Sequence, residues 1–158
     1  SNWGNEGHDT VYPPETDIDF TATYPGWYRA VSWRNWYSTA DDNYLIELDD
    51  ARETLFRTER PIDCGTGYAF AELIADERGD VVFKIESNHA AKVWLNGSLV
   101  YSAPDGTRRT ETTAEEIEAF LKQGRNTVLV KVSTSPGTDR FSFDVMVPGD
   151  SPGVRWWR

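Results

Sequence analysis

The chain has a single cysteine, Cys64, and two histidines among its 158 residues. One cysteine cannot form an internal disulfide, and without a second cysteine or a nearby histidine it offers no ligand pair for zinc. We therefore expect Cys64 to be a buried free thiol. No uninterrupted apolar stretch approaches the roughly 18 residues that span a bilayer, so we expect no membrane insertion.

Basic residues are also scarce relative to acidic ones. Sixteen Lys and Arg against 26 Asp and Glu give a formal net charge of -10 at pH 7. A field of this sign repels nucleic acid, and we expect no nucleic-acid partner. The length fits one domain, residues 1–158. Because residue 1 is serine and no signal-peptide pattern precedes residue 20, we expect a domain excised from or matured out of a longer chain.

The usual catalytic signatures are missing from the sequence. There is no phosphate-binding loop, no zinc-protease motif, no Gly-x-Ser-x-Gly elbow and no Cys-x-x-Cys. A histidine-centred triad would need His8 or His89. Glu72 and Glu86 are the least surface-like carboxylates for a glycosidase pair, but the outward face of a strand accounts for both. We expect a protein that is not an enzyme.

Alternation of apolar and polar residues dominates the readable part of the chain. It covers residues 81–86, 128–132 and 141–147 and predicts half-buried strands. Asn96-Gly97 lies between two β-prone runs and predicts a hairpin with a type I′ turn. Further strands are predicted near 29–35 and 43–48. Together these features predict an all-β fold, an antiparallel β-sandwich of the jelly-roll type.

One segment, residues 113–123, departs from the period of two. Thr113 and Glu116 match a capping box, and Gly124 suits the position after a helix. Ile117, Phe120 and Leu121 would form one apolar stripe. This pattern predicts one short helix that caps an end of the sandwich.

Aromatic residues are abundant, with seven each of Trp, Tyr and Phe. Five lie within eleven residues, interleaved with arginine and asparagine: Trp27, Tyr28, Trp33, Trp36 and Tyr37. Sugar rings stack on flat aromatic side chains, and planar polar groups bond their hydroxyls, so this composition indicates a carbohydrate platform. The alternative is that alternate members fill the core, which we expect for Trp33. Trp94 is expected on the face opposite Val93 and Leu95.

Three stretches carry a resemblance to a known family: residues 3–15, 91–97 and 121–132. They resemble jelly-roll, galactose-binding-like modules of secreted bacterial multidomain proteins, and the last two also resemble the sugar-binding sandwich domains appended to family 2 glycosidases. The resemblance implies an extracellular or cell-surface accessory module without catalysis. Where the family often has Ser-Asp-Asp-Gly, this chain has Ser87-Asn88-His89-Ala90, which leaves Asn88 and His89 as candidate hydroxyl partners.

The leading hypothesis is a non-catalytic carbohydrate-binding module that recognises a polysaccharide. Its site residues would be the aromatic platform and four polar contacts: Trp27, Tyr28, Trp36, Tyr37, Asn88, His89, Arg108 and Arg109. The alternative is a structural or adhesive protein-interaction domain of a secreted or cell-surface assembly. No cofactor is expected, although loop acids Glu6, Asp9, Asp41 and Asp42 suit a structural calcium ion as well as a solvated surface. We expect that Ser1 or the terminal residues 154–158, which include Trp156 and Trp157, pack against the sheet or a neighbouring subunit.

Overall fold

The computed structural model describes residues 6–26, 30–34, 45–47, 65–87, 89–104, 113–134, 140–146 and 153–156. Two short helical turns open the chain, α1 (Glu6–Asp9) and the 3-10 turn η1 (Pro13–Glu15). Within the described residues, eleven strands follow: β1 (Thr23–Tyr24), β2 (Val31–Ser32), β3 (Leu45–Glu47), β4 (Gly65–Ala75), β5 (Gly79–Ser87), β6 (Ala90–Leu95), β7 (Ser98–Ala103), β8 (Thr113–Leu121), β9 (Gly124–Thr134), β10 (Arg140–Met146) and β11 (Val154–Trp156).

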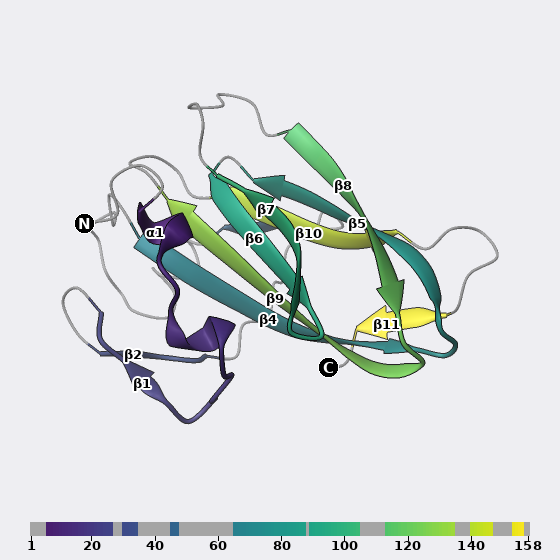
Figure 1. Ribbon diagram of the computed structural model, residues 1–158, viewed down its shortest axis with the longest axis horizontal. Helices are drawn as coiled ribbons and strands as arrows, with labels where there is room; N and C mark the ends of the chain where they lie inside the picture. The colour runs from purple at the N-terminus through teal and green to yellow at the C-terminus, as the bar shows by residue number, and fades with distance from the viewer. Residues whose placement is uncertain are drawn as a thin grey trace.

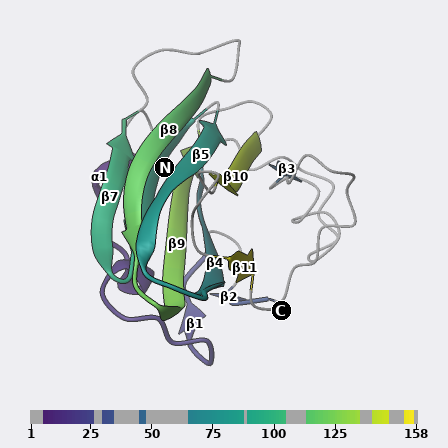
Figure 2. The ribbon, with the colours of Figure 1, turned by 90° about the vertical axis from the view of Figure 1, so that its right-hand side faces the viewer.

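The strands build two antiparallel sheets that pack face to face (Figures 1 and 2). One sheet has the order β3-β10-β5-β8, and the other has the order β11-β4-β9-β6-β7. A separate hairpin pairs β1 with β2. Every pairing among the described strands is antiparallel. The predicted all-β antiparallel sandwich is confirmed, and β2 and β3 lie within the strands expected near 29–35 and 43–48.

The hydrophobic core lies between the two sheets and is built from the alternating positions seen in the sequence. Its fully buried side chains include Leu73, Phe83, Ile85, Val93 and Leu121. Each such side chain contributes about 1.5–3 kcal/mol of burial free energy. The central pair, β4 and β9, stays in register from Gly65↔Thr134 to Ala75↔Gly124. This long pairing makes the five-stranded sheet a rigid support.

The prediction of a helix over residues 113–123 is wrong, because residues 113–121 of this segment form strand β8. β8 pairs with β5 along its whole length, from Ser87↔Thr113 to Gly79↔Leu121. Ile117 and Leu121 point into the core, whereas Phe120, which the helical stripe would have buried, is 56% exposed. Long-range pairing and burial outweigh the local helical preference here. Gly124 keeps the expected positive φ, at 86°, but serves a strand-to-strand turn.

Two other expectations hold. Asn96 and Gly97 have φ values of 51° and 81° in the turn between β6 and β7, as a type I′ hairpin requires. At the other end, β11 adds to the edge of the five-stranded sheet by pairing with β4, with Arg155 opposite Ile74. The terminal segment therefore packs against the sheet through β11, while Trp157 lies outside the described residues.

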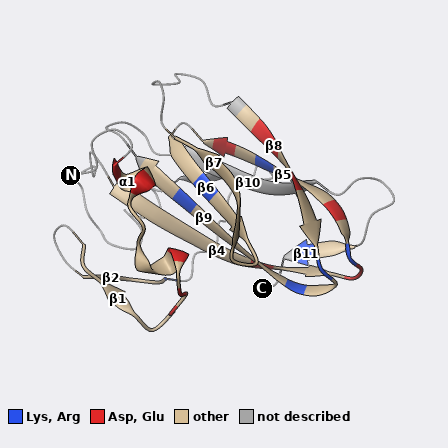
Figure 3. Cartoon of the chain, viewed as in Figure 1, with Lys and Arg blue, Asp and Glu red and all other residues tan. Residues whose placement is uncertain are grey.

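The N-terminal arm, residues 6–26 and 30–34, lies on the outer face of the five-stranded sheet. Figure 1 shows α1 beside β4, β9 and β6, all three of which it contacts, and the β1–β2 hairpin on the β4 side of the sheet. Basic segments of β6 and β9 lie beside acidic segments of the arm in Figure 3. The arm thus covers a sheet face that would otherwise meet solvent.

Candidate functional site

The outer face of the five-stranded sheet carries its side chains in rows across β4, β9 and β6. Ala69, Val130 and Val93 pack into the core, so their neighbours along each strand point outward. The strand register places two outward rows side by side: Tyr68-Lys131-Lys92 and Phe70-Leu129-Trp94. Trp94 and Leu129 are buried on this face, so Trp94 lies opposite Val93 and Leu95 as predicted.

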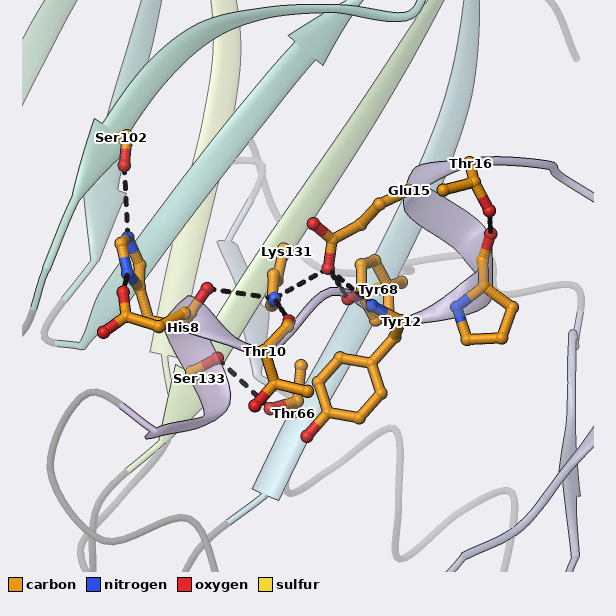
Figure 4. Close-up of polar contacts among 12 residues, drawn as sticks. His8, Thr10, Tyr12, Glu15, Thr16, Thr66, Tyr68, Ser102, Lys131 and Ser133 are labelled. Atoms are coloured by element: carbon orange, nitrogen blue, oxygen red, sulfur yellow. Dashed lines mark hydrogen bonds and ion pairs between the residues drawn. The ribbon is translucent and has the colours of Figure 1, made fainter.

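Lys131 stands at the centre of the first row and is fully buried, with 0% exposure. Its Nζ donates to the carbonyl of His8 at 3.1 Å, the carbonyl of Thr10 at 2.6 Å and Glu15 Oε1 at 2.7 Å (Figure 4). An ammonium group has three N–H donors, and here each meets an acceptor from the arm. The arm therefore completes the hydrogen bonding of a lysine that the sheet alone leaves unpaired.

Glu15 is the second centre of this network. Its Oε1 also accepts hydrogen bonds from the hydroxyl of Tyr68 at 2.6 Å and from the backbone N–H of Tyr12 at 3.1 Å. The Lys131 ammonium lies 5.1 Å from the centroid of the Tyr12 ring, within cation–π range. We call Lys131, Glu15, Tyr68 and the carbonyls of His8 and Thr10 the lysine clasp.

The electrostatics of the lysine clasp follow from burial and pairing. Burial alone would raise the pKa of Glu15, but hydrogen bonds from Lys131, Tyr68 and Tyr12 outweigh it and leave that pKa below its ordinary value. Burial lowers the pKa of Lys131, and the bond to Glu15 opposes this shift. Burial and the ionised Glu15 together raise the pKa of Tyr68. At neutral pH the clasp is an ion pair with a neutral tyrosine donor.

A second polar link ties α1 to strand β7. The imidazole of His8 is buried, with Nδ1 2.9 Å from Asp9 Oδ1 and Nε2 3.2 Å from Ser102 Oγ. The order Asp-His-Ser resembles a hydrolase triad, in which the carboxylate is buried. Here the Asp9 side chain is 73% exposed. We therefore interpret these contacts as structural ones that hold α1 against β7. The hydrogen bond from His8 also lowers the pKa of Asp9.

Beyond the lysine clasp, Phe20 and Trp33 of the arm and Phe70 of β4 form an aromatic patch. The Phe20 ring packs edge to face on Trp33 at a centroid distance of 5.6 Å and on Phe70 at 5.1 Å. Phe20 is nevertheless 55% exposed. Two fixed neighbours thus hold an exposed aromatic ring against the outer face of the sheet.

Trp33 belongs to this patch and not to the core where it was expected. It is half-buried beside Phe20, outside the cluster between the sheets. Its Nε1 is buried and has no hydrogen-bond partner within the described part of the chain. A two-residue strand followed by an irregular segment does not maintain the alternation from which the core position was predicted.

The turn that precedes the hairpin is fixed by Asp19. Its Oδ1 accepts hydrogen bonds from the backbone N–H of Thr21 at 2.8 Å and from the Thr21 hydroxyl at 2.7 Å. These bonds lower the pKa of Asp19. The hairpin then pairs Tyr24 with Val31. In the sequence, Trp27 and Tyr28, two of the predicted platform residues, fall between Phe20 and Trp33 of the patch and lie outside the described residues.

Most of the predicted site residues lie outside the described residues: Trp27, Tyr28, Trp36, Tyr37, Asn88, Arg108 and Arg109. Cys64, Asp41 and Asp42 lie outside them as well. His89 is described, half-buried at the turn between β5 and β6, where its backbone N–H donates to Ser87 Oγ at 3.2 Å. The pairing of Ser87 with His89 is therefore a backbone turn contact.

The two carboxylates considered for catalysis, Glu72 and Glu86, are not brought together. Glu72 points outward from β4 and pairs with Arg125 at 3.2 Å, whereas Glu86 points outward from β5 and pairs with Lys84 at 3.4 Å. They lie on opposite outer faces and cannot flank one glycosidic bond. Among the described residues no group of three or more His, Cys, Asp or Glu side chains is placed to hold a metal. Calcium binding stays a prediction.

Sequence reasoning missed the lysine clasp. Lys131 occupies an outward position of a strand, where lysine is ordinarily solvated, and Glu15 lies 116 residues away. The only signal was that residues 3–15 and 121–132 both belong to the stretches that resemble one family. Nothing in either stretch alone indicates that they bond to each other.

Comparison with known proteins yields structural likenesses only. By sequence, the chain matches no protein-family model and no curated protein. Its fold is similar to part of a β-glucosidase from Kluyveromyces marxianus in complex with glucose, with a TM-score of 0.54, 20% identity, and coverage of 68% of this chain and 14% of the enzyme. A family 35 carbohydrate-binding module from Clostridium thermocellum gives a TM-score of 0.39 at 20% identity, covering 52% of this chain and 70% of the module.

The β-glucosidase likeness supports the sandwich fold, and this chain spans only a small part of that enzyme's length. At 20% identity it indicates no shared site. Within the described residues, no helix combines the length and hydropathy needed to cross a membrane.

Proposed function

We propose that this domain is a non-catalytic carbohydrate-binding module that recognises a neutral polysaccharide outside the cell or at its surface. The binding surface would be the aromatic patch on the outer face of the five-stranded sheet. By its composition, segment 27–37 would add the predicted platform residues Trp27, Tyr28, Trp36 and Tyr37, with arginine and asparagine as polar partners for sugar hydroxyls.

The observation that carries this proposal is the exposed Phe20 ring held between Trp33 and Phe70. A sugar ring stacks on an aromatic face that is both accessible and fixed, because a fixed ring loses little conformational freedom on binding. Arg34 is exposed directly after Trp33 and supplies planar donors for hydroxyl groups.

Charge and fold narrow the ligand class. A net charge of -10 repels polyanionic glycans, which favours a neutral chain. Part of a β-glucosidase that was crystallised in complex with glucose has a similar fold. This likeness is compatible with a sugar-binding accessory domain. The fold by itself carries no function, so the site residues must decide.

Affinity electrophoresis tests the proposal. Native gels cast with galactomannan, β-glucan or xylan should retard the wild-type domain on at least one polysaccharide. We expect Trp27→Ala or Trp36→Ala to weaken that retardation with little loss of stability, because a stacking ring acts through contact area. Unchanged mobility of the wild type on all of these gels and on a glycan array would contradict sugar binding and favour a protein-interaction domain.

A further inference from the structure

The lysine clasp and the aromatic patch are neighbours on the same strand. Tyr68 of the clasp and Phe70 of the patch are two residues apart on β4 and point to the same outer face. Two residues along a strand span about 7 Å. Along the arm, Glu15 precedes Phe20 by five residues. The same two segments, β4 and the arm, therefore contribute to both features.

We infer that Glu15 is a positioning residue for the sugar-binding surface, and that docking of the arm and binding of the polysaccharide are coupled. This inference rests on the proposed function. The hydrogen bonds and ion pair of the Glu15 side chain join it to Tyr12, Tyr68 and Lys131, so it would act through the placement of the arm on the sheet.

The reason lies in how completely the arm satisfies Lys131. All three ammonium donors reach acceptors between His8 and Glu15, and the Glu15 side chain is itself only 6% exposed. A small shift of the arm would leave a buried ammonium group without partners, which is costly. On this inference, the arm has two arrangements: the docked one that the structure shows, and one lifted far enough for water to reach Lys131.

The position of the Phe20 ring depends on the docked arrangement of the arm. When the arm lies in place, its ring meets Phe70, which is fixed to the sheet, and Trp33, which follows the hairpin. When the arm lifts, the patch loses the ring that two neighbours hold. A ligand that binds only the assembled patch must therefore favour the docked arm, and by linkage a variant that lifts the arm must weaken the ligand.

Three variants of the full chain test this coupling. Glu15→Gln keeps the shape of the side chain and removes the charge that pairs with Lys131. Glu15→Gln combined with Lys131→Met removes both buried charges and should restore docking. Asp17→Asn is the matched control, because it changes the same charge on the exposed part of the same arm.

Hydrogen exchange of backbone amides and affinity electrophoresis are measured on each protein. In Glu15→Gln we expect exchange of residues 10–24 to rise at least about tenfold, as the loss of a charge-assisted bond implies. Exchange in β5 and β9 should be unchanged. Affinity for the retarding polysaccharide should fall by a similar factor, recover in the double variant, and match wild type in Asp17→Asn. The polysaccharide itself should slow exchange of the wild-type arm.

The outcomes separate the two proposals. Arm exchange in Glu15→Gln equal to that of wild type overturns the positioning role, whatever the polysaccharide does. Faster arm exchange with unchanged polysaccharide affinity overturns the coupling and leaves sugar binding intact. If no polysaccharide is bound by the wild type, the proposed function fails and the coupling fails with it, while the exchange data still decide whether Glu15 places the arm.

Discussion

Around Val130 and Lys131, the two faces of β9 are buried to the same extent but by different means. Val130 points inward and is 3% exposed, and Lys131, the next residue, points outward and is 0% exposed. The inner face is covered by the four-stranded sheet, through apolar contacts with side chains of β5 and β8. The outer face is covered by the N-terminal arm through one ion pair, two carbonyls and a few aromatic rings.

This difference teaches that burial alone does not measure a residue's contribution to stability. Opening the inner face means separating two sheets, which is global unfolding. Opening the outer face requires only that an arm of a few turns lifts from the sheet, a local event of lower free energy. A substitution on the inner face should therefore lower the free energy of unfolding more than one on the outer face. It should also raise amide exchange over a larger part of the protein.

The largest effect is expected in the inner core. Phe83→Ala removes a side chain that is fully buried between the sheets and leaves a cavity. We expect a loss of about 3–5 kcal/mol in the free energy of unfolding, measured by chemical denaturation. Amide exchange should rise throughout both sheets. A rise confined to β5 would contradict the view that the core is one cooperative unit.

A smaller and local effect is expected on the outer face. Lys131→Met removes the ammonium group and leaves the Glu15 carboxylate with its bonds from Tyr68 and Tyr12. We expect a loss of about 1–3 kcal/mol, limited because the arm can lift and return Glu15 to water. The measurement is denaturation together with amide exchange of residues 8–24. A loss as large as that of Phe83→Ala would show that the arm is part of the cooperative core.

The lysine clasp should also be sensitive to acid. The folded-state pKa of Glu15 lies below its ordinary value of 4.5, so its charge stabilises the fold above that pH. This stability is lost as the pH falls through the folded-state pKa. Asp9 and Asp19 also have lowered pKa values, so the stability of wild type minus that of Glu15→Gln isolates the clasp. We expect this difference to shrink below pH 4.5; a constant difference would contradict the ion pair.

The smallest effect is expected at the exposed edge. Phe120 lies on β8 and is exposed, on a strand that was expected to be a helix. We expect Phe120→Ala to change the free energy of unfolding by no more than about 0.5 kcal/mol in thermal or chemical denaturation. A larger loss would indicate that this ring packs against another part of the protein.

The sequence predicts the inner face well and the outer face poorly. Alternation identifies Val81, Phe83 and Val130 as core positions, because a strand with one buried side carries apolar residues at every second position. The Asn96-Gly97 hairpin was predictable because its turn needs two positive φ values that these residues adopt readily. The prediction for residues 113–123 was wrong although their capping pattern is typical of a helix. Pairing with β5 stabilises a strand there by more than the local preference stabilises a helix.

The outer face could not be derived from the same pattern. Burial of Lys131 depends on a partner 116 residues away, and no local period records such a contact. Trp33 was recognised as part of an aromatic segment, but its place beside Phe20 depends on the path of the arm. The sequence thus predicts which kinds of residue form the candidate site, because composition is a local property. It does not predict how they are arranged, because the docking of the arm depends on contacts between distant segments.

The central claim is that the patch around Phe20 is the sugar-binding surface, and a matched pair of variants tests it directly. Phe20 and Phe120 are the same residue type and almost equally exposed, on different parts of the protein. In native gels containing the retarding polysaccharide, we expect Phe20→Ala to lose roughly tenfold or more in affinity, since it removes a large apolar contact. Phe120→Ala should bind as wild type does. Equal retardation of both variants and wild type would contradict the claim.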